Sequence, residues 1–302
     1  MSEYNFSVIE EVCRKYKCAC ERNFKLAPLT TMEIGGECGL FVEPNSEECL
    51  IEVLNICRAE NIQYFLLGKG SNLLINRYSG VIIKLGSALG GLSFEGNRVT
   101  AGAGGSLAAL CSAAAGKGLS GLESLYGIPG SVGGALYMNA GAYGAEMKDV
   151  VISARCIDQN GNIVELSAEE MKLSYRHSVF SENDFCILSV TMELTNGNEG
   201  EIRARMSEVA AKRRDKQPLE FPSCGSTFKR PEGHFAAALI EECGLKGFTI
   251  GGAQVSEKHS GFVINKGGAS FEDVMALVEH IKRTVREKKG VELECEMLIV
   301  DR

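Results

Sequence analysis

The sequence lacks several residue types and patterns that mark common classes of protein. It has no tryptophan, and none of its four histidines stands four residues from another, as in a helical zinc site. It has neither a Gly-x-Ser-x-Gly nor a Gly-Lys-Ser/Thr segment, which disfavours serine hydrolases and P-loop proteins. No apolar run approaches the roughly 18 residues of a membrane span, and the amino terminus lacks the basic flank and apolar core of a signal peptide. We therefore expect a cytoplasmic protein that does not insert into membranes.

Cysteine spacing and net charge narrow the possibilities further. The twelve cysteines are scattered without a Cys-x-x-Cys pair, and only Cys18 and Cys20 are closely spaced. This pattern predicts reduced thiols that act as small apolar residues, with no metal site. The net charge of −7 argues against nucleic acid as a main partner. The 302 residues, 45% of them hydrophobic and 24% charged, suffice for two domains with a sizeable core.

Glycine, by contrast, is abundant and clustered. Twelve of the 35 glycines fall between Gly102 and Gly144. Because glycine costs conformational entropy on folding, such clustering indicates positive φ angles or close approach of the main chain to a ligand. Exposed amide N–H groups in such turns suit a phosphate or pyrophosphate. The alternative interpretation is a series of tight surface turns.

A second glycine segment has the same character. Gly68-Lys69-Gly70-Ser71-Asn72 separates the short apolar runs Tyr64–Leu67 and Leu73–Ile75. This order predicts a strand, an anion-binding loop and another strand. Neither Gly68-x-Gly70 nor Gly102-x-Gly104 has the third glycine of the dinucleotide fingerprint, so a Rossmann fold is disfavoured.

Apolar periodicity predicts an α+β protein in two parts. A polar, glycine-rich break at residues 196–200 separates a first domain, 1–199, with subdomains of about 1–85 and 86–199, from a second domain, 200–302. Helices are expected near residues 9–16, 45–57, 106–115, 201–216 and from Ser270, and strands near 64–67, 81–85, 154–158, 187–194 and 291–299.

The last two of these elements have informative side chains. Ser270 and Asp273 have the spacing of a capping box. In the expected strand 291–299, Glu292, Glu294 and Glu296 share one face, which usually means a solvent-exposed sheet surface. That face becomes apolar after Glu296, so this carboxylate is expected at the edge of a cavity.

Two further segments combine side chains suited to catalysis. Residues 222–231 place hydroxyls beside a glycine, Lys229 and Arg230, which suits a phosphorylated substrate and a proton donor. A simple loop between prolines is the alternative. Tyr175-Arg176-His177 brings together a phenol, a guanidinium and an imidazole, although surface Tyr-Arg pairs are common.

These segments together resemble the UDP-N-acetylenolpyruvoylglucosamine reductase family, from about Leu26 to the end of the chain. The family is a flavoprotein with non-covalent FAD, in a fold like that of vanillyl-alcohol oxidase with a C-terminal α/β substrate-binding domain. It uses NADPH to reduce UDP-N-acetylglucosamine enolpyruvate to UDP-N-acetylmuramate for peptidoglycan. The matching segments are 31–36, 67–74, 121–123, 127–144, 175–178, 225–229, 247–254 and 293–296.

The resemblance implies a role for individual residues. Ser226 corresponds to the proton donor, and Arg176 and Glu296 to the pair that polarises the substrate carboxylate. Tyr175, Lys229 and Arg230 are expected contacts of the UDP diphosphate and sugar, and no metal is expected. The residues expected at FAD are Gly35, Gly68, Lys69, Gly70, Ser71, Asn72, Pro129, Gly130, Ser131, Gly133 and Gly134.

The chain also departs from the family pattern. Leu298 stands where an arginine is common, and Lys69 where glycine is frequent. Two other functions remain open. One is another FAD-dependent oxidoreductase of this fold, such as an alcohol or sugar oxidase. The other is a non-catalytic flavin- or UDP-sugar-binding protein, which would not need Ser226, Arg176 and Glu296 together.

Overall fold

The computed structural model describes residues 4–302, which form two compact units. The first unit comprises the chain up to Phe24, Gly39–Lys69 and Ser79–Lys212. The second comprises Lys25–Cys38, Gly70–Tyr78 and Arg213–Arg302. The second unit therefore includes two segments from the first third of the chain. The domain ranges expected from the sequence stay a prediction about which parts fold independently.

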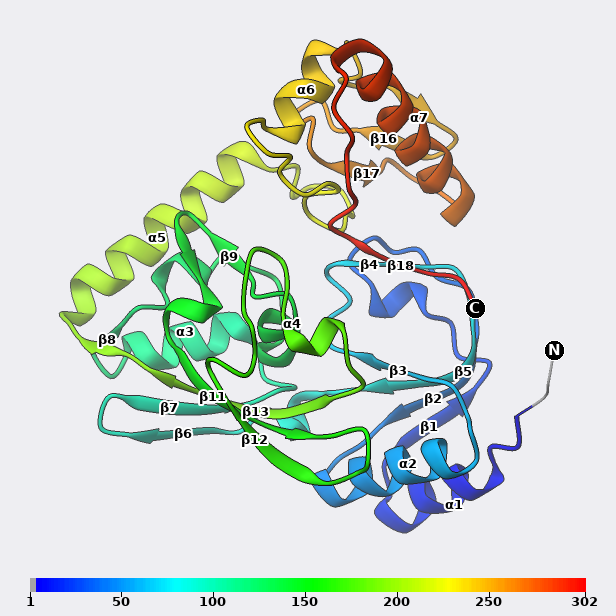
Figure 1. Ribbon diagram of the computed structural model, residues 1–302, viewed down its shortest axis with the longest axis vertical. Coiled ribbons are helices and arrows are strands. Elements are labelled where there is room, and N and C mark those ends of the chain that lie inside the picture. The colour runs from blue at the N-terminus through cyan, green and yellow to red at the C-terminus, as the bar shows by residue number, and fades with distance from the viewer. Residues whose placement is uncertain (1–3) are drawn as a thin grey trace. The chain divides into compact units, whose positions relative to one another are not determined.

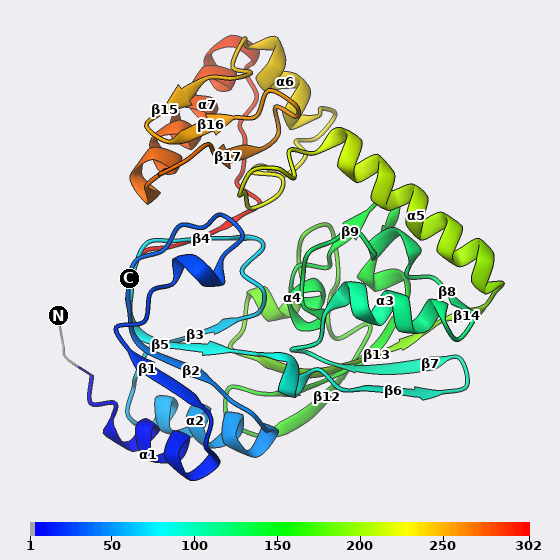
Figure 2. The ribbon, with the colours of Figure 1, turned by 180° about the vertical axis from the view of Figure 1, so that it is seen from behind.

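The amino-terminal part of the first unit is a four-stranded sheet with two helices. The strand order is β1-β2-β5-β3, with β1 antiparallel to β2 and β3 parallel to β5. The helices α1 and α2 lie side by side against the sheet (Figures 1 and 2). The bounds are α1 Ser7–Tyr16, β1 Ala19–Arg22, β2 Cys38–Glu43, α2 Glu47–Ala59, β3 Tyr64–Leu67 and β5 Tyr78–Lys84.

Local sequence explains both helices. In α1, the apolar side chains of Ile9, Val12 and Cys13 recur at helical spacing and are buried. The hydroxyl of Ser46 accepts a hydrogen bond from the Cys49 amide and caps α2 at the start of the helix expected near 45–57.

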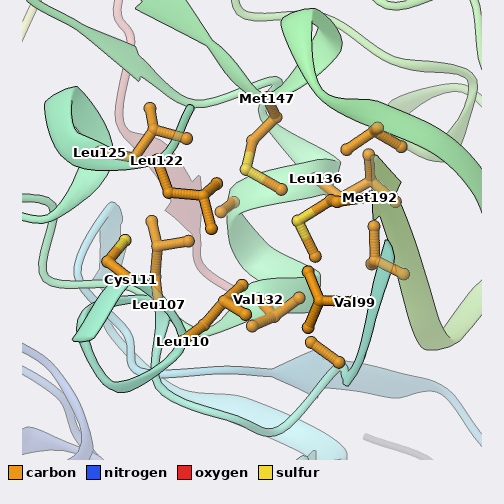
Figure 3. Packing of buried hydrophobic residues seen from close by; sticks show 14 of the residues in the cluster. Val99, Leu107, Leu110, Cys111, Leu122, Leu125, Val132, Leu136, Met147 and Met192 are labelled. Carbon is orange, nitrogen blue, oxygen red and sulfur yellow. The ribbon is translucent and has the colours of Figure 1, made fainter. Parts of the chain in front are cut away.

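The rest of the first unit is built on a five-stranded antiparallel sheet of order β12-β11-β13-β7-β6. The helices α3 and α4 pack their apolar side chains against it, and Figure 3 shows Val132 and Leu136 of α4 beside Val99 and Met192 of the sheet. The bounds are β6 Leu92–Glu95, β7 Arg98–Gly102, α3 Leu107–Ala115, α4 Val132–Tyr137, β11 Val151–Ile157, β12 Ile163–Ser167 and β13 Cys186–Glu193.

Short elements complete this unit. Strand β8 (Leu119–Ser120) pairs with β14 (Thr195–Asn196), and β9 (Gly141–Ala142) pairs with β10 (Ala145–Glu146). The helix α5 (Glu199–Lys216) begins within the expected polar break, so the break is no extended linker. Single 3₁₀ turns lie at Ser87–Leu89, Glu123–Leu125, Met147–Asp149 and Val179–Ser181, and a further one, Ala27–Leu29, belongs to the second unit.

The second unit packs two helices against a three-stranded antiparallel sheet of order β15-β16-β17. The helix α7, capped by the expected box of Ser270 and Asp273, runs alongside β16 (Figure 1). Strands β4 and β18 form a separate parallel pair. The bounds are β4 Leu73–Ile75, α6 Ala236–Glu242, β15 Thr249–Ile250, β16 Ala253–Val255, β17 Val263–Asn265, α7 Phe271–Lys289 and β18 Leu298–Val300.

The expected α+β class is confirmed, whereas the last expected strand is largely wrong. Of the predicted strand 291–299, only residues 298 and 299 lie in a strand, β18 (Leu298–Val300), which pairs with β4. Residues 291–297 contain a single bridge, from Cys295 to Phe228. No helix within residues 4–302 combines the length and apolar character needed to cross a membrane.

Candidate active site

The loop 68–72 lies between β3 and β4, as the sequence predicts. Gly70 has φ +59°, and a Cβ there would stand 2.2 Å from the carbonyl oxygen of Leu29. Only glycine allows this close approach. Within residues 4–302, the amide N–H groups of Gly68 to Asn72 donate to no protein acceptor. A pyrophosphate is a suitable acceptor for such a set of amides, so the loop fits the expected FAD group.

The second glycine loop meets the start of the first one within the first unit. A Cβ on Gly68 would stand 2.4 Å from the Ser131 hydroxyl oxygen. The ammonium of Lys69 donates a 2.8 Å hydrogen bond to the hydroxyl of Ser106, and Ser106 forms a bridge with Ser131. The structure therefore brings together two segments that the sequence assigns separately to FAD.

The amides of the second loop are used differently from those of the first. Gly130 donates to Ile128, Gly133 to Ala103, and Gly134 to the hydroxyl of Ser131. Gly133 also serves close packing of the chain, since a Cβ there would stand 2.8 Å from that of Ala103. Their assignment to FAD stays a prediction, as do those of Pro129, Ser131 and Gly35. Gly35 belongs to the second unit, packed against Leu26 and Ala27.

Arg176 occupies a tight turn in the first unit. Ser174 and His177 exchange two backbone hydrogen bonds of 3.1 Å, which closes the turn. Arg176 has φ +53° at its third position, as in a type II turn. One guanidinium nitrogen donates to the carbonyl oxygen of Gly141 at 3.1 Å, and the group lies 5.1 Å from the ring centre of Tyr175. The side chain of Tyr175 is exposed.

A buried asparagine holds this turn in place. The side-chain amide of Asn139, which is fully buried, donates to the Ser174 carbonyl oxygen at 2.8 Å and to the Glu146 carboxylate at 3.0 Å. Its own carbonyl oxygen accepts from the Lys148 amide at 2.9 Å. The Lys148 ammonium and, after it, the Asn139 amide hold the pKa of Glu146 below its usual value. The carboxylate that partners Asn139 is thus stabilised in its charged form.

A second polar contact reinforces the same connection. The buried hydroxyl of Ser178 donates a 2.6 Å hydrogen bond to the carbonyl oxygen of Tyr137. Residues 137–141 and 174–178 are therefore joined by three side-chain bonds, from Asn139, Arg176 and Ser178. Neither Asn139 nor Ser178 is among the site residues expected from the sequence. In the sequence, Asn139 is a polar residue within a glycine-rich stretch, and Ser178 precedes two apolar residues. Neither pattern reveals that the side chain is buried.

Ser226 lies on a loop of the second unit. Gly225 precedes it with φ +75°, a value that favours glycine, and Thr227 follows it. Thr227 is fixed, because its amide donates to Gly261 and its hydroxyl accepts from the Val263 amide, each at 2.9 Å. Ser226 itself is exposed. Its side chain is thus held at the surface by neighbours that are firmly anchored.

Glu296 lies beside this loop in the same unit. Its amide donates to the Thr227 carbonyl oxygen at 2.9 Å, and its own carbonyl oxygen accepts from the Asn72 side chain at 3.0 Å. Glu296 is half-buried. The structure therefore places three predicted site residues, Asn72, Ser226 and Glu296, on neighbouring segments of one unit.

Lys229 and Arg230, the two cations of the second unit expected at the UDP diphosphate, already have partners. The Lys229 ammonium lies 2.5 Å from the Glu294 carboxylate. The Arg230 guanidinium lies 4.6 Å from the ring centre of Phe235. Their role as diphosphate contacts, like that of Tyr175 in the first unit, stays a prediction. No group of three or more metal-ligating side chains within residues 4–302 is arranged to hold a metal ion.

Comparisons with known proteins agree with this geometry. The family model for the UDP-N-acetylenolpyruvoylglucosamine reductase C-terminal domain matches residues 217–300, and an FAD-binding domain model matches residues 39–167. A UDP-N-acetylenolpyruvoylglucosamine reductase of Caldanaerobacter subterraneus is 45% identical over 99% of both chains. One from Clostridium novyi is 48% identical over 93% of this chain and 92% of its own. The chain belongs to the UDP-N-acetylenolpyruvoylglucosamine reductase family.

A solved structure supports the same assignment. The crystal structure of the reductase from Thermus caldophilus has a TM-score of 0.80 and 34% identity, and the match covers 94% of this chain and all of that one. The expected FAD-binding fold is confirmed by this match and by the FAD-binding domain model. This reductase is therefore an FAD-dependent oxidoreductase of peptidoglycan precursor synthesis, with NADPH as its hydride donor.

Proposed function

We propose that Ser226, Arg176 and Glu296 perform the substrate half of this reductase reaction. The observation that carries the proposal is the alignment of the Ser226 loop beside Glu296, fixed by the bond from the Glu296 amide to Thr227. FAD, when bound, supplies the transfer of hydride from NADPH to the methylene carbon of the enolpyruvyl group. The chain must then manage the negative charge that develops on the neighbouring carbon and its carboxylate.

Ser226 is the proposed proton donor. Its hydroxyl is exposed on a fixed loop and donates its proton to the carbon that carries the negative charge. A loop anchored through Thr227 limits the motion of that hydroxyl, which favours transfer at one position.

Arg176 and Glu296 stabilise the charge before that proton arrives. The Arg176 guanidinium offers several N–H donors to the substrate carboxylate, and the bond to Gly141 orients it. Glu296, in its protonated form, would donate a further hydrogen bond to the same carboxylate. Lys229, Arg230 and Tyr175 are proposed to contact the UDP diphosphate and sugar.

The loop 68–72 is proposed to hold the FAD pyrophosphate. Its amides have no protein acceptor within the described residues, and Gly70 allows an approach that a side chain would block.

The NADPH and UDP-sugar substrates are metabolites of the cell interior, so we also propose a cytoplasmic location.

An anaerobic flavin cycle tests the proposed function. Purified protein with FAD should lose its yellow colour when NADPH is added, and UDP-N-acetylglucosamine enolpyruvate should restore it. Recovery of the colour with oxygen alone, and not with this substrate, would favour an oxidase.

A further inference from the structure

Four of the twelve cysteines gather at one place in the first unit. Cys13 lies in α1, Cys18 follows that helix, Cys20 lies in β1 and Cys49 lies in the first turn of α2. The sulfur atoms of Cys18 and Cys49 are 3.6 Å apart. The neighbouring Cys20 thiol and, after it, burial raise the pKa of the Cys13 thiol. The closely spaced pair Cys18 and Cys20 is therefore part of a group of thiols that the sequence does not reveal.

The contact between Cys18 and Cys49 is braced on both sides. The Lys15 ammonium of α1 pairs with the Glu52 carboxylate of α2 at 2.7 Å. The side-chain amide of Asn45 donates to the carbonyl oxygen of Tyr16 at 2.8 Å. A disulfide has its sulfur atoms about 2.05 Å apart, so an approach of roughly 1.5 Å suffices to form one. The proposal below requires side-chain rotations that close this gap while the two helices stay in place.

Only one member of the pair is open to a small molecule. Cys18 lines a pocket of about 560 Å³. The other lining residues are Cys13, Cys20, the acidic Glu10 and the exposed cations Arg14 and Lys17. Cys49 is fully buried and does not line this pocket. The positive charges beside this accessible thiol attract an anionic reagent. Cys18 is therefore accessible from the pocket, whereas Cys49, which contacts it, is not.

We propose that Cys18 and Cys49 are a redox-active pair, which a small anionic disulfide oxidises to an intramolecular disulfide. The Cys18 thiolate attacks one sulfur of the small molecule, forming a mixed disulfide and releasing one thiol, which takes up the proton. The sulfur of Cys49 then attacks the sulfur of Cys18, loses its proton and displaces the second thiol. Two electrons pass from the protein to the small molecule, and one S–S bond is exchanged for another.

The two steps differ in their pH dependence. Burial, and after it contact with Cys18, raises the pKa of Cys49 to about 12. Cys49 is thus protonated near neutral pH, and its attack is slower than that of a typical thiol. The mixed disulfide on Cys18 should therefore accumulate first, and its conversion should accelerate as the pH rises.

Oxidation of the full-length, FAD-loaded protein by glutathione disulfide tests the proposal. Samples are quenched with acid at intervals, their free thiols are alkylated, and the peptides are mapped by mass spectrometry. We expect a glutathione adduct on Cys18, followed by a disulfide of Cys18 and Cys49 and a net loss of about 2 Da. A thiol reductant should reverse the change. A disulfide of Cys13 and Cys20 alone, or adducts that never convert, would overturn the proposal.

Serine variants test which cysteine attacks the small disulfide first and which one attacks the mixed disulfide. Cys49→Ser should stop at the adduct on Cys18, and Cys18→Ser should leave Cys49 unmodified. Cys295→Ser removes a half-buried thiol of the second unit and should leave the sequence of events unchanged. If Cys18→Ser or Cys49→Ser fails to fold, the peptide map of the wild-type protein still shows whether the disulfide joins Cys18 to Cys49 or joins other cysteines.

Discussion

The Glu296 amide donates a 2.9 Å hydrogen bond to the Thr227 carbonyl oxygen, which fixes the end of the chain beside the residue that follows Ser226. The Asn72 side chain in turn donates to the carbonyl oxygen of Glu296. One residue of the proposed FAD loop thus holds a proposed catalytic segment through backbone atoms. Substitutions of these residues should therefore separate effects on position from effects on chemistry.

Gly70→Ala should weaken both folding and FAD binding. Its Cβ would meet the Leu29 carbonyl oxygen at 2.2 Å, and the left-handed φ adds strain. We expect a loss of about 3 kcal/mol in unfolding free energy and a lower FAD content in the purified protein. Denaturant unfolding and the flavin absorbance per chain measure the two effects.

Gly96→Ala is the matched control for that variant. Gly96 has the same φ of +59°, but a Cβ there meets nothing within 4 Å. It should cost about 1 kcal/mol, from the left-handed conformation alone, and leave the FAD content unchanged. Equal losses in both variants would show that the approach to Leu29 is unimportant.

Asn139→Asp should loosen the Arg176 turn. The substitution keeps the size of the side chain but replaces both N–H donors by an acceptor next to Glu146. We expect about 3 kcal/mol lower stability and slower oxidation of the reduced flavin by the enolpyruvyl substrate, with FAD reduction by NADPH unchanged.

Asn183→Asp provides the comparison for that prediction. Asn183 is exposed and donates one 3.1 Å bond to the Val179 carbonyl oxygen, so its loss should cost about 0.5 kcal/mol. If Asn139→Asp slows both half-reactions alike, Asn139 supports the whole unit rather than the Arg176 turn.

Asp273→Asn should destabilise the second unit in a pH-dependent manner. Hydrogen bonds from the Gly252 and Ser270 amides hold the pKa of Asp273 below its usual value. The folded-state pKa is therefore lower than the unfolded one, and the carboxylate stabilises the fold above about pH 4. This contribution is lost as the pH falls through the folded-state pKa. Thermal unfolding of both proteins from pH 7 to pH 2.5 should show a difference that disappears at the acidic end.

Glu272→Gln tests whether this effect comes from the hydrogen bonds. Glu272 carries the same charge in the same first turn of α7 and is exposed. Its removal should change the unfolding midpoint less than Asp273→Asn does. An equal change would attribute the effect to the helix dipole instead.

Elements specified by neighbouring residues were predictable from the sequence. The capping box of Ser270 and Asp273, the Ser46 cap and the strands around the loop 68–72 each depend on a few adjacent side chains. The alternation of Leu293 with Glu294 suggested a strand, but strand formation needs a partner. Only Leu298–Val300 has one, and that partner, β4, is more than 200 residues away in sequence.

The rest of the candidate site depends on such distant pairings. Asn139 gains its role only when Ser174 is placed next to it, and no local pattern reports that contact. Likewise, Cys49 meets Cys18 only through the packing of α2 on α1. The residue pattern alone pointed to Glu296 and to the segments 175–177 and 222–231. The resemblance to the reductase family was needed to assign roles to Ser226, Arg176 and Glu296.

The most direct test of the account separates the two half-reactions of Ser226→Ala by stopped-flow absorbance, with Ser223→Ala from the same loop as control. Ser226 is proposed to protonate the substrate and has no part in hydride transfer from nicotinamide. Flavin reduction by NADPH should therefore stay near the wild-type rate, whereas reoxidation by UDP-N-acetylglucosamine enolpyruvate should slow by about 10²–10⁴-fold. Ser223→Ala should leave both rates unchanged. An unimpaired second half-reaction in Ser226→Ala, or equal slowing of both, would contradict the assignment of Ser226 as proton donor.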